Sequence, residues 1–383
     1  MTIKFFDCDR HVAEPMAMWS DYLDPKYNDY LPYLVEDTLE DCAGRTIKYG
    51  ADKNFLLFPE VHVKGMPLYN NWSEPARIDV YLHSQKHKSP FKATTGEKQI
   101  ESMDAGNAEI AYIFPSAALC LVNSEQLPAD VKSAYANAYN RWLLDYCKYD
   151  VARLRAIGVV NRYSPDAMLS ELDIIINNGW TSVTLRPEVL GGRDLGHADY
   201  EEFWKRCESN NIAVAFHGST HLYGNTAGTE RYNTRFALHA CSHPMEAQMA
   251  FLSLLESGVL DRYPSLKFAF FEAGASWLPA WLWRLDELCY DTMPTELSHH
   301  IKMKPSDYFK RQCWIGFEFG EPCLREVANC VGIEKMLFGS DFPHPDHSQF
   351  DIEALQEESD FSIEELELIL QNNPGAFFEK QAI

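Results

Sequence analysis

The sequence predicts an α/β protein, a (β/α)₈ TIM barrel with a large insertion after its first strand. Three observations support this fold class: short apolar runs recur along the chain, helical patterns separate them, and no glycine-rich phosphate turn follows the first run. Near-continuous apolar runs are typical of parallel strands buried on both faces. A doubly wound open sheet is the alternative, but it would normally bring a glycine-rich turn after the first strand.

Eight apolar runs are candidate strands, each rich in Ile, Val, Leu or Phe and each followed by a polar loop. They span residues 3–9, 109–115, 154–160, 181–186, 212–217, 267–272, 313–319 and 335–341. Strands and helices that alternate in this way over most of a chain are typical of a β/α barrel.

Helical patterns cover residues 128–148, 164–179, 199–211, 242–258 and 362–380. Two of these carry start and stop signals. The helix over 164–179 opens with Ser164 and Pro165 and ends at Gly179, and the helix over 242–258 opens with Ser242 and Pro244. A cap residue with proline near the first turn, and glycine just past the end, marks helix boundaries.

Residues 16 to about 96 interrupt the strand–helix alternation and are rich in Tyr, Pro and Asp. We expect them to form an insertion between the first two strands, lying over the catalytic face. Residues 277–309 form a second, smaller excursion. The chain is otherwise expected to be one barrel domain over residues 1–383.

Composition excludes several classes of protein. The chain has 383 residues, 46% of them apolar, and a formal net charge of −22. Such a charge argues against nucleic acid or an anionic membrane as a partner. There is no CxxC pair, which argues against a zinc ribbon or a thioredoxin-type site. Acidic residues interrupt the first apolar run, which argues against a signal peptide. No run approaches the ~18 apolar residues of a membrane helix. We therefore expect a cytoplasmic protein that binds a small-molecule substrate.

Candidate functional residues stand where the predicted strands end. Asp9 and His11 end the first strand, His217 the fifth, Glu272 the sixth and Asp341 the eighth. Functional side chains of such barrels come from the carboxyl ends of the strands. Residues i and i+2 of a strand face the same side, so Asp9 and His11 should point at one place. Asp7 shares this parity but lies deeper in the strand.

Mixed nitrogen and oxygen ligands suit Zn²⁺, Mn²⁺ or Fe²⁺ with a position kept open for water. Each residue also has a structural alternative: Asp9 and His11 as polar loop residues, His217 as a hydrogen-bonded core histidine, and Asp341 as a helix cap. Glu272 follows aromatic and small residues, and a carboxylate there needs a partner. The coincidence at four strand ends favours a metal site.

Further residues near the predicted strand ends are candidates for substrate binding. Arg186 follows the fourth strand and is either a carboxylate anchor or half of a salt bridge at the rim. His344 follows the eighth strand and could reach the mouth of the site. Trp277 has helical spacing with Trp281, which is typical of packing as well as of a substrate pocket. His239 and His243 flank the start of a predicted helix and are as consistent with a structural role as with a functional one.

Four segments carry a resemblance to a known family. "DCDRHVAEP", His217 after "IAVAF", "YPSLKFAFFEAGASWLPAWLWRLD" and "KMLFGSDFPHPD" resemble the amidohydrolase-related branch of the amidohydrolase superfamily, which includes aminocarboxymuconate-semialdehyde decarboxylase and dihydroxybenzoate decarboxylases. The resemblance runs from Phe5 to about Gly375. The first and last of these motifs are fairly specific as a pair.

The resemblance implies one divalent ion, zinc first and manganese or iron as alternatives, held by Asp9, His11, His217 and Asp341. It also suggests a homodimer. The main departure is Glu272, which stands where the decarboxylases carry a histidine that helps to activate water or protonate the ring. A glutamate can still act as a general base or ligate the metal.

The resulting expectation is a metal-dependent hydrolase of a small, apolar or aromatic ester, lactone or amide. Glu272, Asp341 and His217 would be catalytic, and Arg186, His344 and Trp277 would bind substrate. One alternative is a non-oxidative decarboxylase of an aromatic or unsaturated acid. The other is a barrel without catalysis that acts as a binding protein.

Overall fold

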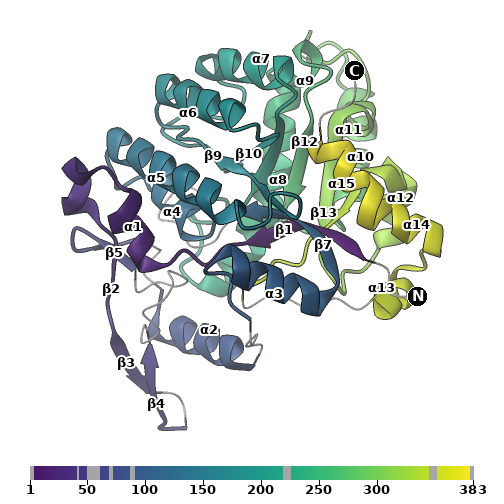
Figure 1. Cartoon of the computed structure of the whole chain (residues 1–383). Helices are drawn as coiled ribbons and strands as arrows, with labels where there is room; N and C mark the ends of the chain where they lie inside the picture. The colour runs from purple at the N-terminus through teal and green to yellow at the C-terminus, as the bar shows by residue number, and fades with distance from the viewer. Residues whose placement is uncertain are drawn as a thin grey trace.

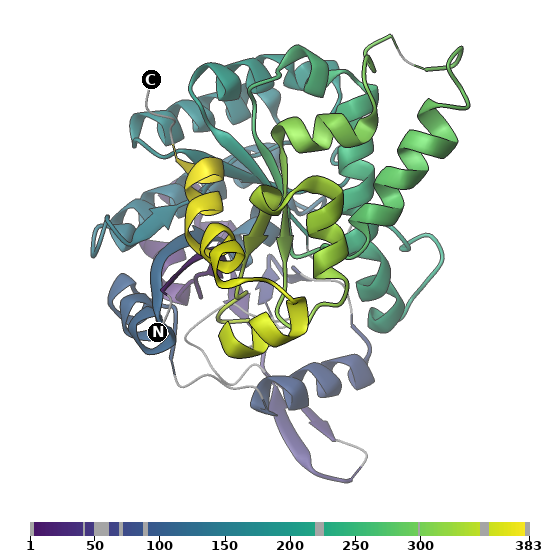
Figure 2. The ribbon, with the colours of Figure 1, turned by 90° about the vertical axis from the view of Figure 1, so that its right-hand side faces the viewer.

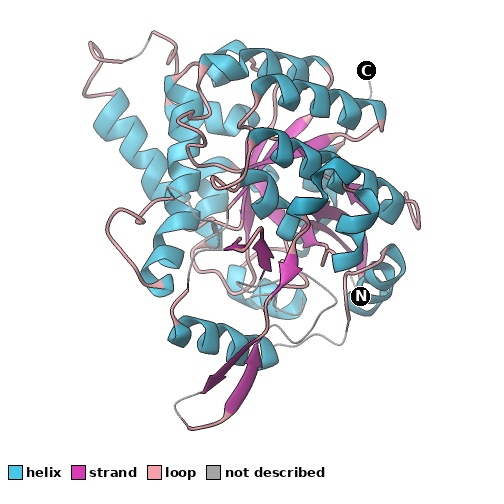
Figure 3. Ribbon diagram, turned by 90° about the vertical axis from the view of Figure 1, so that its left-hand side faces the viewer, coloured by secondary structure: helices cyan, strands magenta, loops and turns pink. Residues whose placement is uncertain are grey.

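The computed structural model describes residues 4–40, 43–49, 61–68, 72–86, 91–218, 226–297, 299–344 and 352–379. Its central strands are parallel and are surrounded by helices (Figure 1, Figure 3). They are β1 (Phe5–His11), β7 (Ala108–Phe114), β8 (Leu154–Ala156), β9 (Gly158–Val159), β10 (Ser182–Leu185), β11 (Ala213–His217), β12 (Phe268–Phe271), β13 (Cys313–Phe317) and β14 (Met336–Phe338). All eight predicted strands are confirmed, the third being divided into β8 and β9.

The strand order is that of a barrel. One sheet runs β14-β13-β12-β11-β10-β9 and the other runs β1-β7-β8, and only Ile157 separates β8 from β9. At the remaining seam β1 lies beside β14. The backbone N–H of His11 donates to the carbonyl of Phe342 at 2.7 Å, and the N–H of Asp341 donates to the carbonyl of Asp9 at 2.9 Å. These two bonds join the ends of the strands that carry candidate ligands.

Helices pack around the strands and bury their outer faces. They are α3 (Gly96–Gly106), α4 (Ala117–Asn123), α5 (Ala129–Cys147), α6 (Pro165–Asn177), α7 (Glu201–Ser209), α8 (Arg235–Glu256), α9 (Val259–Arg262), α10 (Leu278–Trp283), α11 (Pro305–Gln312), α12 (Leu324–Val331), α13 (Ile352–Ser359), α14 (Ile363–Glu367) and α15 (Asn373–Phe378). The short 3₁₀ and π segments are η2 (Ala198–Tyr200), η3 (Arg284–Tyr290), η4 (Ile333–Lys335) and η5 (Leu368–Asn372).

The helix predicted over 242–258 begins earlier than the sequence signals indicated. α8 starts at Arg235, where the Thr234 hydroxyl accepts a hydrogen bond from the N–H of Ala237, and Pro244 lies inside the helix. The prediction was wrong here because a threonine cap further upstream opens the helix. The earlier start gives α8 two additional turns before Ser242.

Side chains fill the barrel interior, so it is a packed core. Small residues of β11 and β12 face large ones from other strands, and α15 adds two phenylalanines. The buried interior group consists of Cys8, Tyr112, Phe114, Ile157, Ala213, Ala215, Ala269, Phe271, Trp314, Leu337, Phe377 and Phe378. Lys267, directly before β12, donates to the carbonyls of Ala376 and Phe377, so α15 closes the amino end of the barrel. A functional site is therefore left to the carboxyl ends of the strands.

Additional elements lie between β1 and β7. They are α1 (Met16–Tyr22), η1 (Pro25–Tyr30), β2 (Tyr33–Leu34), β3 (Asp37–Glu40), β4 (Thr46–Tyr49), β5 (Val61–Val63), β6 (Met66–Pro67) and α2 (Glu74–Lys86). The β3–β4 hairpin and α2 project from one side of the molecule, away from both termini (Figure 1, Figure 2). That this part is an insertion covering the catalytic face stays a prediction.

The buried carboxylate of Asp7 holds β1 to the loop after β14. It accepts hydrogen bonds from the backbone N–H and hydroxyl of Ser340 at 2.9 and 2.6 Å, and from Nη1 of Arg10 at 2.9 Å. Arg10 is also buried and lies over the ring of Phe342. Removing one partner of a buried ion pair leaves the other charge uncompensated.

We predict that Asp7→Ala lowers the free energy of unfolding by about 3–5 kcal/mol, the usual cost of breaking a buried ion pair. Urea unfolding would measure it. The matched control is Asp104→Ala, which removes an exposed ion pair of 2.7 Å with Arg153 and should cost less than about 1 kcal/mol. Equal losses in the two variants would contradict the role of Asp7.

A second buried carboxylate, Glu171 of α6, accepts the backbone N–H of Asn161 at 2.6 Å just after β9. Burial raises the pKa of Glu171 to about 7 from its ordinary 4.5. The folded protein therefore binds this proton more tightly than the unfolded chain. Its stabilising contribution is complete below about pH 4.5 and is lost as the pH rises through about 7.

Glu171→Gln should remove this pH dependence. Relative to the unchanged protein, its unfolding free energy should increase by on the order of 3 kcal/mol between pH 5 and pH 8. Urea unfolding at both pH values would measure the change, with Glu256→Gln on the exposed end of α8 as the control. A constant difference at the two pH values would count against an ionisation of Glu171 near neutrality.

Candidate metal centre

Asp9 and His11 lie at the carboxyl end of β1, where the strand is irregular. The pairing of β1 with β7 shifts register between Asp7 and Arg10. Phe6 and Cys8 pack in the barrel interior, so regular alternation would turn Asp9 away from it. Local irregularities of this kind redirect side chains near active sites. The prediction that Asp7 shares the side of Asp9 was wrong, because the Asp7 carboxylate bonds to Ser340 and Arg10 instead.

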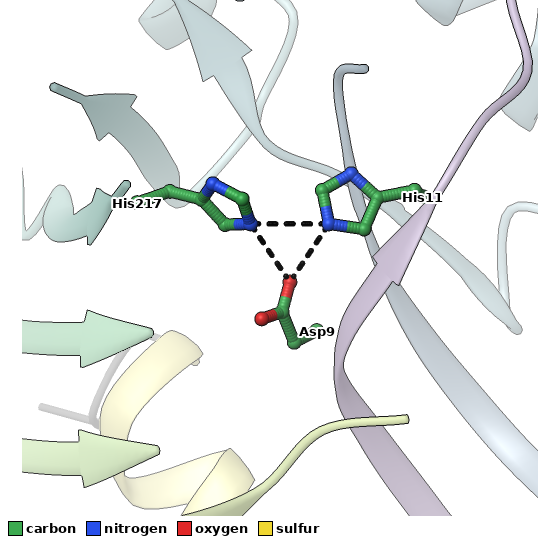
Figure 4. Close-up of side chains that lie close together, drawn as sticks. All are labelled: Asp9, His11 and His217. Carbon is green, nitrogen blue, oxygen red and sulfur yellow. Dashed lines mark hydrogen bonds and ion pairs between the residues drawn. The ribbon is translucent and has the colours of Figure 1, made fainter. Parts of the chain in front are cut away.

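Three buried side chains converge on one point (Figure 4). Nε2 of His217, at the end of β11, lies 3.1 Å from Nε2 of His11. Oδ1 of Asp9 lies 3.3 Å from Nε2 of His11 and 3.5 Å from Nε2 of His217. The structure therefore brings together three of the four ligands expected from the sequence.

The backbone fixes the tautomer of both imidazoles. Nδ1 of His11 lies 2.8 Å from the carbonyl oxygen of Pro115, and Nδ1 of His217 lies 2.9 Å from that of Gly218. A carbonyl only accepts, so each Nδ1 carries the proton and each Nε2 presents a lone pair. Metal-ligating histidines have this arrangement, in which the other ring nitrogen donates to a carbonyl or carboxylate.

The atoms at the centre fit a cation. Two Nε2 lone pairs face each other, and among the described residues no N–H or O–H group donates a hydrogen bond to Oδ1 of Asp9. Burial lowers the pKa of His11, and the nearby His344 lowers it further. A carboxylate with two neutral imidazoles is a donor set for a divalent ion.

Asp341, on the loop after β14, lies beside His11 but outside the group formed by Asp9, His11 and His217. Its Oδ1 lies 3.3 Å from Nε2 of His11. Nδ1 of His344 is 2.6 Å from that oxygen, and Nε2 of His344 is 2.8 Å from the hydroxyl of Ser116. His344 therefore links Asp341 to the loop after β7. The expected roles of Asp341 as a ligand and of His344 in substrate binding stay predictions.

Glu272 follows β12 and lies beside His217, with its Oε2 3.2 Å from Nδ1 of that histidine. Its φ is +52°, and that of Asp341 is +55°. Residues other than glycine seldom adopt this left-handed region, and where they do the strain frequently marks a functional site. The side chain of Glu272 is 23% exposed, so the carboxylate can reach both the centre and solvent.

A cavity of about 460 Å³ adjoins the centre, and both Glu272 and Asp341 line it. Its other walls come from the first turns of α8, the segment after β12 and the loop after β13. The remaining lining residues are His239, Ala240, His243, Pro244, Ala273, Gly274, Glu318, Phe319, Glu321, Phe338, Gly339 and Ser340. Its volume lies in the range of small-molecule sites.

Arg186 and Trp277 have structural partners. Arg186 is buried, and its Nε donates to Glu188 at 2.8 Å. The indole N–H of Trp277 donates to the carbonyl of Gly274 at 2.7 Å, and the ring packs against the core. These contacts favour the structural alternatives considered for both residues. Their expected roles in substrate binding stay predictions.

Glu14, just after β1, is not among the candidate residues that the sequence indicated. The structure buries Glu14 completely, and its carboxylate accepts the backbone N–H groups of Ser116, Ala117 and Ala118. It thereby fixes the loop that carries Ser116. Only its proximity in sequence to His11 could have suggested this role, because the partners are about 100 residues away.

Fold and centre together define a β/α barrel with a candidate mononuclear metal site at the carboxyl ends of its strands. Residues 6–380 match a family described as amidohydrolase, so the chain belongs to this family. A curated relative, 2-amino-3-carboxymuconate-6-semialdehyde decarboxylase of Dictyostelium discoideum, is 23% identical over 156 residues, which cover 41% of this chain and 42% of the relative.

Solved structures share the fold. An amidohydrolase of Mycobacterium avium subsp. paratuberculosis K-10 matches with a TM-score of 0.71 and 20% identity, over 98% of this chain and 99% of that one. A dihydroxybenzoic acid decarboxylase of Polaromonas sp. JS666, with bound manganese and 2-nitroresorcinol, matches with a TM-score of 0.66 and 14% identity, over 100% and 98%. A 5-carboxyvanillate decarboxylase of Sphingomonas paucimobilis matches with a TM-score of 0.67 and 15% identity, over 98% of this chain and 99% of that one. The barrel fold and the resemblance to decarboxylases expected from the sequence are confirmed.

No helix in the described part of the chain is both long and apolar enough to span a bilayer.

We predict that Asp9→Asn weakens binding of Mn²⁺ or Zn²⁺ by at least about 100-fold, beyond the 10–100-fold typical of losing a residue that only supports a ligand. Calorimetric titration of metal-free protein would measure the dissociation constant. Asp173→Asn, which alters an exposed pair with Arg206, serves as the control. Metal affinity unchanged by Asp9→Asn would rule out a ligand role for Asp9.

Proposed function

We propose that this protein is a metal-dependent, non-oxidative decarboxylase of a small aromatic or unsaturated carboxylic acid. The observation that carries the proposal is the convergence of Asp9, His11 and His217, whose lone pairs face one another beside a cavity lined by Glu272 and Asp341. The decarboxylases among the similar proteins favour this reaction over the hydrolysis that the sequence suggested first.

Asp9, His11 and His217 would hold the divalent ion, with Asp341 as a further ligand. When bound, the ion would orient the carboxylate of the substrate and polarise the groups next to it. Manganese is present in the Polaromonas decarboxylase. Zinc and iron are compatible with the same donor atoms. The hydrogen bonds of Nδ1 to Pro115 and Gly218 would keep both imidazoles in the ligating tautomer.

Glu272 is the candidate proton carrier. In decarboxylation the bond between the carbon and its carboxylate breaks, CO₂ leaves, and the electron pair stays on the carbon until a proton arrives. Oε2 of Glu272 faces His217, so we assign the proton to Oε1. General acid catalysis by a positioned side chain contributes about 10²–10⁴-fold.

The elements around the cavity would control the access of water and contact the substrate. We propose that residues 16–96 limit access of water to the cavity and that aromatic residues there contact the substrate. Arg186, His344 and Trp277 remain candidates for supporting substrate binding. A homodimer remains the proposed assembly.

Hydrolysis of an ester, lactone or amide is the second candidate. The position of Glu272 favours it, because a carboxylate beside a candidate metal centre can also act as a general base toward water. A barrel that only binds a ligand is a third candidate, which any turnover would exclude.

Metal-loaded protein should release CO₂ from 2,6-dihydroxybenzoate or a related hydroxybenzoic acid and leave a panel of esters and lactones intact. Glu272→Gln should lower kcat by about 10²–10⁴-fold while the metal content stays unchanged. Glu256→Gln, on the exposed end of α8, is the control and should retain full activity. Cleavage of esters or lactones without CO₂ release from any acid would instead establish the hydrolase.

A further inference from the structure

His243 of α8 stands in the wall of the cavity with its tautomer fixed. Its Nδ1 lies 2.7 Å from the backbone carbonyl of Glu272, so Nδ1 carries the proton and donates it. His243 is 8% exposed and lines the cavity. Burial, together with the neighbouring His239, lowers the pKa of His243 to about 3. The imidazole is therefore neutral and can only accept through Nε2.

No residue that the structure describes donates a hydrogen bond to this Nε2. Among the described residues, His243 contacts the backbone and carboxylate of Glu272 and the ring of His239, and none of these gives Nε2 a hydrogen bond. Nε2 itself is not fully buried and is open to the cavity. A ligand that fills the cavity would bury it, and a buried acceptor without a donor is unfavourable. The ligand of this cavity should therefore offer a donor to His243.

The other charged groups of the wall are acidic. Glu272, Glu318, Glu321 and Asp341 line the cavity, and no lysine or arginine does among the described residues. Glu321 already accepts the N–H groups of Ala275 and Ser276. A carboxylate placed among these groups would meet like charges.

We infer that His243 is a specificity-determining residue, whose Nε2 accepts a hydrogen bond from a hydroxyl or amino group of the substrate, and that the acidic wall excludes a second carboxylate. The inference rests on the proposed function, which places the reacting carboxylate of the substrate at the metal. The site should therefore bind monocarboxylic acids that carry a hydroxyl or amino group more tightly than their methoxy analogues and more tightly than dicarboxylic acids.

Binding rather than turnover tests this inference. Manganese-loaded, full-length protein would be titrated calorimetrically with 2-hydroxybenzoate, 2-aminobenzoate, 2-methoxybenzoate and benzene-1,3-dicarboxylate. The hydroxy and amino compounds should bind about 10–100-fold more tightly than the methoxy compound, the usual effect of leaving a buried acceptor unpaired. The dicarboxylate should bind most weakly.

Two substitutions separate the role of Nε2 from packing. His243→Leu should abolish the preference for hydroxy over methoxy, and His243→Gln, which keeps an acceptor, should restore at least part of it. Circular dichroism would confirm that both variants are folded. If His243→Leu does not fold, the ligand series on the unchanged protein still decides the question.

Three results would overturn the inference: equal binding of hydroxy and methoxy compounds, tightest binding of the dicarboxylate, or no binding of any compound to metal-loaded protein. Failure of the proposed function gives a different result. In that case the hydroxy preference would be present without CO₂ release from any acid. CO₂ release without the hydroxy preference would leave the decarboxylase in place and remove the role of His243.

Discussion

The hydrogen bonds between the Asp7 carboxylate and Ser340 are the constraint on which the candidate centre depends. They hold β1 against the loop after β14, the seam at which the barrel closes. Gly339 permits this approach, since a Cβ there would come within 2.3 Å of the Cβ of Asp9. Because the seam is this tight, Asp341 meets His11 although 330 positions of sequence separate them.

Backbone carbonyls orient three histidines in the same way. Nδ1 of His11, His217 and His243 each faces a carbonyl oxygen, that of Pro115, Gly218 and Glu272 respectively. Each ring therefore presents an Nε2 lone pair. Two of these lone pairs meet Asp9 at the candidate metal centre, and the third stands in the cavity wall. The same hydrogen bond, from Nδ1 to a backbone carbonyl, therefore orients the lone pairs of the candidate metal centre and the acceptor in the cavity wall.

Glu272 connects these two parts. Its carboxylate approaches His217, its carbonyl fixes His243, and its backbone is held at a φ of +52°. A left-handed backbone costs on the order of 1–3 kcal/mol for a residue other than glycine. The packed barrel below, filled by Phe271 and its neighbours, holds the residue in that conformation. The strain turns the side chain and the carbonyl toward different histidines.

The sequence by itself determined the barrel strands and the polar residues at their carboxyl ends. Apolar runs buried on both faces can be recognised in a sequence, and Asp9, His11, His217, Glu272 and Asp341 lie at the ends of these runs or just after them. It could not determine contacts that depend on register and on distant loops. The register shift in β1 turns Asp9 inward and Asp7 outward. The upstream start of α8, the link from Ser116 through His344 to Asp341, and the contact of His243 with the carbonyl of Glu272 likewise exist only once the chain is folded. Each of these depends on which backbone groups come within hydrogen-bonding distance, and only the closed tertiary structure sets those distances.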